Sequence, residues 1–335
     1  MPDTKTIYGP TTYSCSGTSR SANSAPEVAR RLHRCLGMTA RKSAPLERLS
    51  KGAASYGRAA QRDADALLAA VVRQIDARRV ILFVGAGISA GLGLPTWEDF
   101  IGRLGTDVGF EPSEFLALSS DFRSLAEFYR LEQGSLDALS SKMAADWQVS
   151  DEALCASQAH QLIVRLNFPI VYTTNYDPLL ERAYRLAGRA FNRIVNARDI
   201  ACSDASLPTI VKFHGDLSDP GSMVLAETDY MRRLSFEHPL DMKLAADAFG
   251  SAVLFIGYSV SDINLRVLLY RLRGIWRDSG CEDARPRSYV LMTTANQVQE
   301  RILDSWGVAP LIATDADETK AVAVFLERLC ALSGR

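Results

Sequence analysis

Two polar side chains that could carry out chemistry follow short apolar runs of the sequence. Asn175 comes directly after the run 169–174 (PIVYTT), and His214 lies near the end of the run 209–215 (TIVKFHG). An amide can hydrogen-bond a ribose hydroxyl or hold a water molecule, and a neutral imidazole is a good general base near neutral pH. A single histidine is more often a satisfied structural residue, but the neighbouring polar loops favour the catalytic interpretation. Asp177 precedes Pro178, which is typical of a helix N-cap.

A glycine-rich loop follows another apolar run. The segment 85–91 reads GAGISAG, and glycines let a backbone turn sharply and approach a pyrophosphate. Its spacing differs by one residue from the usual dinucleotide fingerprint, so the loop could also be a simple tight turn. Pro95, Thr96 and Trp97 follow and could line a ligand pocket, although Trp97 could equally belong to the core.

Later strand ends offer candidates for the far half of a dinucleotide. Gly257, Tyr258 and Ser259 follow the apolar run that begins at residue 252, and they could contact a phosphate or an adenosine ribose. The segments 289–298, which includes Thr293, and 311–318 are further candidates for the adenosine end.

These loops require strands that end at one edge of a sheet. Short apolar runs at 80–87, 169–174, 209–215, 252–259 and 288–294 alternate with helical patterns. Such alternation predicts an α/β, Rossmann-like parallel sheet with helices on both faces. Ligands of these sheets bind at the carboxyl ends of the strands, so we expect the loops to converge on one crevice.

The chain divides by composition into two parts. Residues 1–60 are rich in Ser, Ala and Arg, which predicts a disordered or regulatory N-terminal arm, and we expect 61–335 to form a domain that carries the candidate chemical residues. Within that domain, 104–166 is predominantly helical, and we expect either a helical insertion or cap, or simple packing helices.

Overall composition excludes several classes of protein. The formal net charge is -1, which gives no electrostatic reason to expect direct nucleic-acid binding. The six cysteines include no closely spaced pair, so we expect reduced thiols in the cytoplasm, no disulfide scaffold and no metal. No apolar run is long enough to span a membrane, and no signal peptide opens the chain.

Taken in order, four motifs resemble those of the sirtuin superfamily. They are GAGIS at 85–89, TTNYD at 173–177, HG at 214–215 and GYS at 257–259, and the resemblance covers about residues 80–320. Two features depart from protein-deacylating sirtuins. The loop Pro95-Thr96-Trp97-Glu98 replaces a Pro-Asp-Phe-Arg loop, and no cysteine lies between His214 and Gly257, where deacylases carry a zinc module.

This combination is similar to the sirtuin-like NAD hydrolases of prokaryotic antiphage defence. The resemblance implies NAD+ as substrate and cleavage of its nicotinamide–ribose bond to nicotinamide and ADP-ribose, which depletes cellular NAD. It implies that Asn175 positions the ribose or the attacking water and that His214 is the general base. The cofactor-binding residues that it implies are Gly85, Ala86, Gly87, Ser89, Pro95, Thr96, Thr174, Asp177, Gly257, Ser259 and Thr293.

Three alternatives stay open on the same scaffold. A protein deacylase or ADP-ribosyltransferase would need an acyl-lysine cleft, for which the sequence offers no support. A module that senses NAD or ADP-ribose without turnover would not need both Asn175 and His214. A nicotinamide-dependent dehydrogenase would need the regular glycine fingerprint.

A hydrolase that consumes NAD must be regulated, because unrestrained activity would kill its host. We expect a homo-oligomer, a separately encoded partner, or both. The resemblance makes a HerA-type hexameric ATPase one candidate partner, with the helices of 104–166 as the contact surface. The sequence leaves open whether the product is linear or cyclic ADP-ribose, and what triggers the enzyme.

Overall fold

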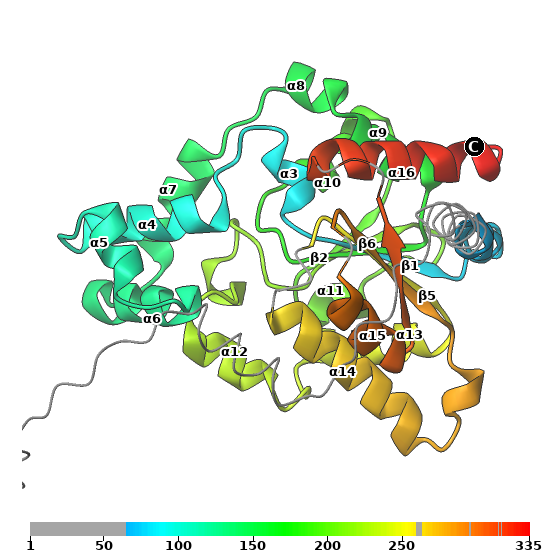
Figure 1. Ribbon diagram of the computed structural model, residues 1–335. Helices are drawn as coiled ribbons and strands as arrows, with labels where there is room; N and C mark the ends of the chain where they lie inside the picture. The colour runs from blue at the N-terminus through cyan, green and yellow to red at the C-terminus, as the bar shows by residue number, and fades with distance from the viewer. Residues whose placement is uncertain (1–64, 259–262, 295, 314, 316) are drawn as a thin grey trace, which may run out of the picture. The chain divides into compact units, whose positions relative to one another are not determined.

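A parallel sheet forms the centre of the protein. The computed structural model describes residues 65–258, 263–294, 296–313, 315 and 317–335 (Figure 1). The predictions for residues 1–60 and for Ser259 therefore lie outside the described residues. None of the described helices has the length and hydropathy of a membrane span.

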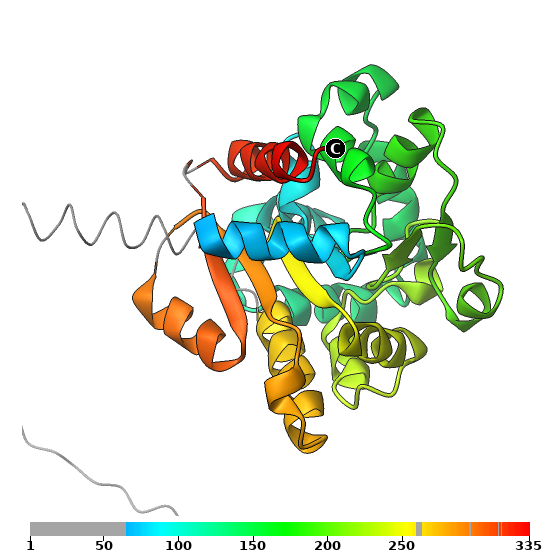
Figure 2. The same cartoon turned by 90° about the vertical axis from the view of Figure 1, so that its right-hand side faces the viewer.

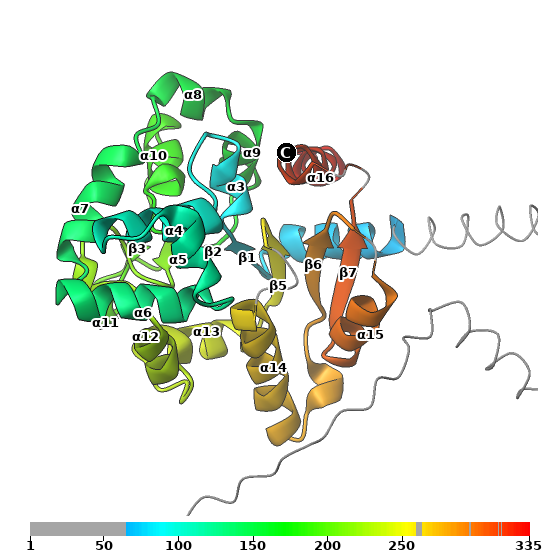
Figure 3. The same cartoon turned by 60° about the vertical axis from the view of Figure 1, so that its left-hand side comes forward.

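All seven strands of the sheet run parallel. Their order is β3-β4-β2-β1-β5-β6-β7. The sheet confirms the predicted α/β, Rossmann-like fold, and Figure 3 shows the strands side by side. The strands are β1 (Val80–Val84), β2 (Ile170–Thr173), β3 (Asn192–Ile194), β4 (Thr209–Lys212), β5 (Ala252–Ile256), β6 (Ser288–Met292) and β7 (Val308–Ile312).

Side-chain alternation along the strands builds a core on each face of the sheet. From β1, Leu82 and its even-numbered neighbours enter one core, while Ile81 and Phe83 enter the other. The first core is closed by residues 65–76 and by α9 (Gln158–Leu166), α10 (Leu179–Leu186) and α16 (Glu318–Leu332). The second is closed by α13 (Pro239–Phe249), α14 (Ile263–Asp278) and α15 (Gln297–Ser305), and Figure 2 shows the two helical layers.

The sheet changes its direction of growth at β1. Strands β2, β4 and β3 extend it to one side, and the chain then crosses to place β5, β6 and β7 on the other. Loops diverge at such a switch point, and this is where ligands of open α/β sheets bind. The loops after β1 and β5 meet there, and each begins with a glycine, Gly85 and Gly257.

A helical module with its own core lies beside the sheet. It contains α4 (Trp97–Asp107), α5 (Pro112–Ala117), α6 (Phe122–Gln133) and α7 (Asp137–Asp146), which pack around Phe115 and Leu104. Tyr176 and Leu225, from loops of the sheet domain, join this core. By contrast, α8 (Asp151–Ala156) and α9 contribute Leu154 and Ile163 to the sheet core. The range 104–166 therefore contains helices of two kinds, and its role as one insertion stays a prediction.

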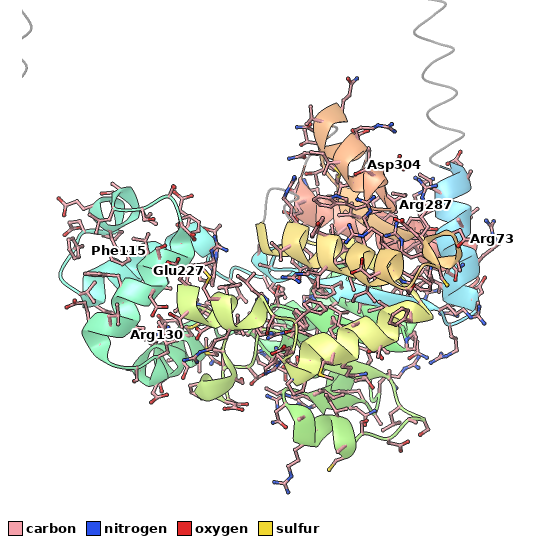
Figure 4. The ribbon with its side chains drawn as sticks, turned by 90° about the horizontal axis from the view of Figure 1, so that it is seen from below. Arg73, Phe115, Arg130, Glu227, Arg287 and Asp304 are labelled. Atoms are coloured by element: carbon pink, nitrogen blue, oxygen red, sulfur yellow. The ribbon has the colours of Figure 1, made fainter. Side chains whose placement is uncertain are left out.

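Charged contacts join the module to α12 (Glu227–Arg233), which follows the β4 loop. Arg130 of α6 pairs with Asp229 at 2.8 Å, and Ser124 donates to Glu227 at 2.8 Å. Arg130 and Glu227 both lie where the module meets α12 (Figure 4). The short remaining helices are α3 (Gly87–Ala90) and α11 (Ala197–Ala201), with 3-10 turns η1 (Pro220–Ser222) and η2 (Glu282–Ala284).

The module's packing makes a prediction for two glycines of α4. A Cβ at Gly105 would lie 2.4 Å from the Cβ of Phe115, whereas a Cβ at Gly102 would meet the Leu116 side chain and the Cβ of Pro112 at the wider distance of 3.3 Å. We expect Gly105→Ala to lower the free energy of unfolding by about 1–3 kcal/mol, because it overpacks the α4–α5 contact. Gly102→Ala, the matched control, should be near neutral, since alanine's helix propensity offsets the crowding. Thermal unfolding measures both, and equal effects would contradict the packing.

Candidate functional site

Strand register places the chemistry-bearing loops level with one another. Val84 of β1 pairs with Thr173 of β2 and with Ile256 of β5, and Thr173 pairs with Lys212 of β4. Asn175 and His214 each lie two residues beyond the paired Thr173 and Lys212, so they occupy equivalent positions at neighbouring strand ends. The carboxyl edge of β4, β2, β1 and β5 is therefore the candidate site.

The side chain of Asn175 is fixed in one orientation. It is 8% exposed, and its Nδ2 donates to the backbone carbonyl of Gly85 and to the hydroxyl of Ser89, both at 3.2 Å. A carbonyl oxygen can only accept, so the amide nitrogen must face Gly85. The Thr173 hydroxyl holds the loop by accepting from the Asn175 backbone N–H at 3.0 Å and donating to the Val84 carbonyl at 3.0 Å.

The amide oxygen of Asn175 is left without a partner among the described residues. Oδ1 is buried and accepts no hydrogen bond there. Buried acceptors are rarely unpaired in folded proteins, and each exception calls for an explanation. A ligand hydroxyl or a water molecule that donates to Oδ1 would satisfy it, so the site has a built acceptor for a donor group.

His214 is held as a neutral imidazole. Burial, and secondarily the charge of Arg233, lower its pKa to about 3. Its ring stacks on Phe213 with centroids 5.7 Å apart and meets the edge of Tyr230 at 5.5 Å. No hydrogen bond to the His214 ring is found within the described part of the chain. At neutral pH this histidine can accept a proton, although its low pKa makes it a weak base.

The turn after β1 presses against the turn after β5. A Cβ at Gly85 would lie 2.3 Å from the carbonyl oxygen of Gly257, and Gly257 itself has a φ of 70°. The Gly85 and Gly87 amides donate to Ile256 and Gly257, at 2.9 and 3.1 Å. Contacts with the β5 turn thus explain the glycines at 85 and 87 without any ligand. For Ala86 N–H we find no acceptor in the described residues, which leaves it available to an anion.

Two further predicted residues have contacts within the protein. The Thr174 hydroxyl lies 2.8 Å from the Tyr258 hydroxyl, which links the β2 and β5 loops. Asp177 accepts from the Leu179 N–H at 3.0 Å at the start of α10, but the N-cap residue is Pro178 and not Asp177, because the helix begins one residue later than the sequence predicts. Both lie at the predicted edge, but their contact with a ligand stays a prediction.

The loop before α4 reaches the Asn175 loop through aromatic rings. Thr96 caps α4 by accepting from Asp99 N–H at 3.1 Å, and Pro95 precedes it. Trp97 is 36% exposed and stacks on Phe100, with its ring 6.3 Å from that of Tyr176. Residues 95–97 are therefore close to the site. Thr293 follows β6, two strands from β1, at the same edge of the sheet.

Sequence reasoning missed several residues around these loops. Tyr230 and Arg233, from a helix that no strong periodicity indicates, form part of the surroundings of His214. The carboxylate of Glu318, at the start of α16, lies only 2.6 Å from the point that a Cβ at Gly87 would occupy. Lys212 precedes His214 by two residues and is completely buried. A charged residue within an apolar strand was the sequence signal that could have identified it.

Comparison with known proteins relates this geometry to a family. Residues 169–311 match the family described as a SIR2-like domain. The matched range includes Asn175, His214 and Gly257, and the glycine loop at 85–91 precedes it. The match to this family confirms the predicted sirtuin-like character.

Curated relatives with similar sequences have names that concern NAD and defence. The chain is 28% identical to "NAD(+) hydrolase ThsA" of Enterococcus faecium, over 69% of this chain and 46% of that protein. It is 25% identical to the protein of the same name from Bacillus cereus (strain MSX-D12), over 61% and 42%. "Defense-associated sirtuin 2" of Bacillus subtilis is 26% identical over 60% and 20%. The chain thus spans less than half the length of these relatives.

Solved structures give a weaker overlay. A structure titled "Structural Basis for the Mechanism and Regulation of Sir2 Enzymes" aligns with 78% of this chain and 97% of its own, with 14% identity and a TM-score of 0.36. The fold assignment rests on the sheet topology described above.

Two histidines with lowered pKa values predict how stability depends on pH. Burial lowers the pKa of His160 to about 4, from an ordinary value of 6.5, and that of His214 to about 3. The unfolded chain therefore binds more protons below pH 6.5, and stability falls as the pH drops from 6.5 towards these values. For the fully buried His160 the loss between pH 6.5 and pH 5 is about 2 kcal/mol. Denaturant unfolding at several pH values measures it, and His160→Gln should flatten the profile. Identical profiles in the variant and the wild type would contradict the assignment.

Proposed function

We propose that this chain is an NAD+ hydrolase that cleaves the nicotinamide–ribose bond and releases nicotinamide and ADP-ribose. The observation that carries the proposal is the Oδ1 of Asn175, which has no partner among the described residues and is fixed beside the glycine turn, level with a neutral His214. A ribose hydroxyl or a water molecule is the kind of donor that this oxygen lacks. The names of the curated relatives support NAD as the substrate.

The reaction asks little of the protein beyond positioning. Nicotinamide leaves as a neutral molecule from a cationic glycosidic nitrogen, so positive charge develops at the ribose C1 carbon as that bond breaks. Water then adds to C1 and must lose one proton. Asn175 orients the ribose or the water through Oδ1, and His214 accepts the proton. Because the leaving group departs early, a weak base is sufficient for this late proton transfer.

The other predicted residues would hold the remainder of the dinucleotide. Ala86, whose N–H has no acceptor among the described residues, would offer it to the pyrophosphate, and Ser89 is positioned by Asn175. The lack of side chains at Gly87 and Gly257 would let the dinucleotide approach the backbone closely, and Thr293, which follows β6, would lie along its adenosine half. Depletion of NAD in antiphage defence is the biological role that we propose for this activity.

Substitution of the two central residues tests the mechanism. We expect His214→Ala to lower kcat for NAD cleavage by about 100- to 10,000-fold, the usual contribution of a general base. Asn175→Ala should lower it by about 100-fold through loss of orientation. Liquid chromatography of nicotinamide measures both.

The matched control is Asn196→Ala. Asn196 follows β3, the outermost strand on that side of the sheet, and caps α11 by accepting from the N–H groups of Arg198 and Asp199. Its loss should cost about 1 kcal/mol of stability and leave cleavage unchanged. Full activity in Asn175→Ala and His214→Ala, with their folds intact, would refute the mechanism.

The proposed reaction needs no metal. Among the described residues, no group of three or more His, Cys, Asp or Glu side chains could hold an ion. Prolonged treatment with a strong chelator should therefore leave the rate of NAD cleavage unchanged. Loss of activity that added zinc or magnesium restores would overturn this expectation.

We further propose that the activity is gated by self-association or by a separately encoded partner, for which a HerA-type ATPase is one candidate. Light scattering combined with an NAD assay, with and without the neighbouring gene product, tests the gate. We expect cleavage to increase with oligomer formation or with the partner. A monomer that cleaves NAD rapidly and constitutively would refute the gate while leaving the catalytic proposal standing.

A further inference from the structure

A group of buried charges lies directly behind the two loops of the candidate site. Lys212 is completely buried in β4 and points to the face of the sheet that α10 covers. Its Nζ donates to the backbone carbonyl of Asp177 and lies 3.5 Å from the carboxylates of both Glu181 and Asp216. Arg193 of β3 closes the group from the other side.

The ammonium group of Lys212 joins the ends of both loops. Asp177 follows Asn175 by two residues, and Asp216 follows His214 by two residues. A single cation therefore contacts the backbone of the Asn175 loop and the carboxylate that ends the His214 loop. Among the described residues no hydrogen bond joins Asn175 directly to His214: Asn175 is held by the β1 turn, and the strands beside them are joined where Phe213 N–H donates to the Thr173 carbonyl at 2.7 Å.

The charges within the group balance one another. Burial acts to raise the pKa of Asp216, but the charge of Lys212 and hydrogen bonds from Arg193 and Ser218 outweigh it and hold this pKa at about 2. Glu181 is 1% exposed, with Arg193 3.7 Å away as well as Lys212. The group thus contains two cations and two anions, which is the condition for burying such charges at all.

Stability alone gives a poor reason for this arrangement. Apolar residues of similar volume are often as stabilising as a buried ion pair, or more so, because the ions lose their hydration. A buried charge network does, however, restrict the geometry of the groups that it joins. Apolar contacts along the strand would leave the spacing of the two loops less strictly defined.

We propose that Lys212 is a positioning residue that sets the distance between Asn175 and His214 by tying their loops together behind the site. This inference rests on the proposed NAD hydrolysis for its kinetic consequence. The tie itself is a property of the folded chain, and it can be measured without any substrate.

The kinetic test removes the cation together with one anion, so that no charge is left uncompensated. The double variant Lys212→Met/Glu181→Gln leaves Arg193, which lies 2.6 Å from Asp216 in the wild-type chain, as the partner of that carboxylate. We expect kcat and kcat/KM for NAD to fall together by about 100-fold, with KM little changed, because the loss is one of alignment. A variant that melts at a lower temperature but keeps kcat within about twofold would show that Lys212 has only a structural role, which would overturn the proposal.

The matched control is Lys243→Met/Asp247→Asn. It removes the ion pair between Lys243 and Asp247, which are 2.9 Å apart on α13, on the opposite face of the sheet. It should leave kcat unchanged. An equal loss of kcat in the control would mean that removal of any semi-buried pair impairs the enzyme, and would also overturn the proposal.

Hydrogen exchange on the wild-type chain tests whether the two loops are tied, even if the double variant does not fold or the chain does not cleave NAD. We expect segments 173–177 and 213–216 to open together, with the same free energy of opening. This measurement needs only the protein, without NAD. Independent opening of the two segments would refute the tie, whereas failure of NAD cleavage with coupled opening would refute only the proposed function.

Discussion

The close approach of two backbone turns at the centre of the sheet is the constraint on which the site depends. A side chain at Gly85 would collide with the carbonyl of Gly257, so β1 and β5 can meet at the switch point only because both turns begin with glycine. That approach directs the Gly85 carbonyl towards β2, where it accepts from Asn175. The position of the Asn175 oxygen therefore follows from the absence of two side chains.

Apolar surroundings determine the character of the site as much as its polar atoms do. His214 packs between Phe213 and Tyr230, and this burial keeps the imidazole neutral. Tyr230 belongs to α12, which is ion-paired to the helical module through Asp229 and Arg130. The module also reaches the Asn175 loop, since Tyr176 joins its core. Through these contacts the module touches both loops of the site.

Sequence patterns predicted the central strands well because those strands are buried on both faces and read as continuous apolar runs. They missed the two edge strands. Strand β3 has only three residues, two of them polar, and β7 contains Pro310, which an edge strand tolerates. Asn175 and His214 could be identified because each directly follows a recognisable strand. The surroundings of His214 could not, because Tyr230 and Arg233 come from a separate helix. The link between Lys212 and the Asp177 carbonyl could not either, because it depends on the pairing of β2 with β4.

The central claim is that this chain uses water to break the bond between nicotinamide and ribose. The most direct measurement incubates concentrated protein with an equimolar amount of NAD in water labelled with heavy oxygen, with and without the neighbouring gene product, and analyses the products by mass spectrometry. The account predicts equal amounts of nicotinamide and ADP-ribose, with one labelled oxygen in the ADP-ribose. NAD that stays intact under both conditions, or that is cleaved at its pyrophosphate instead, would contradict it.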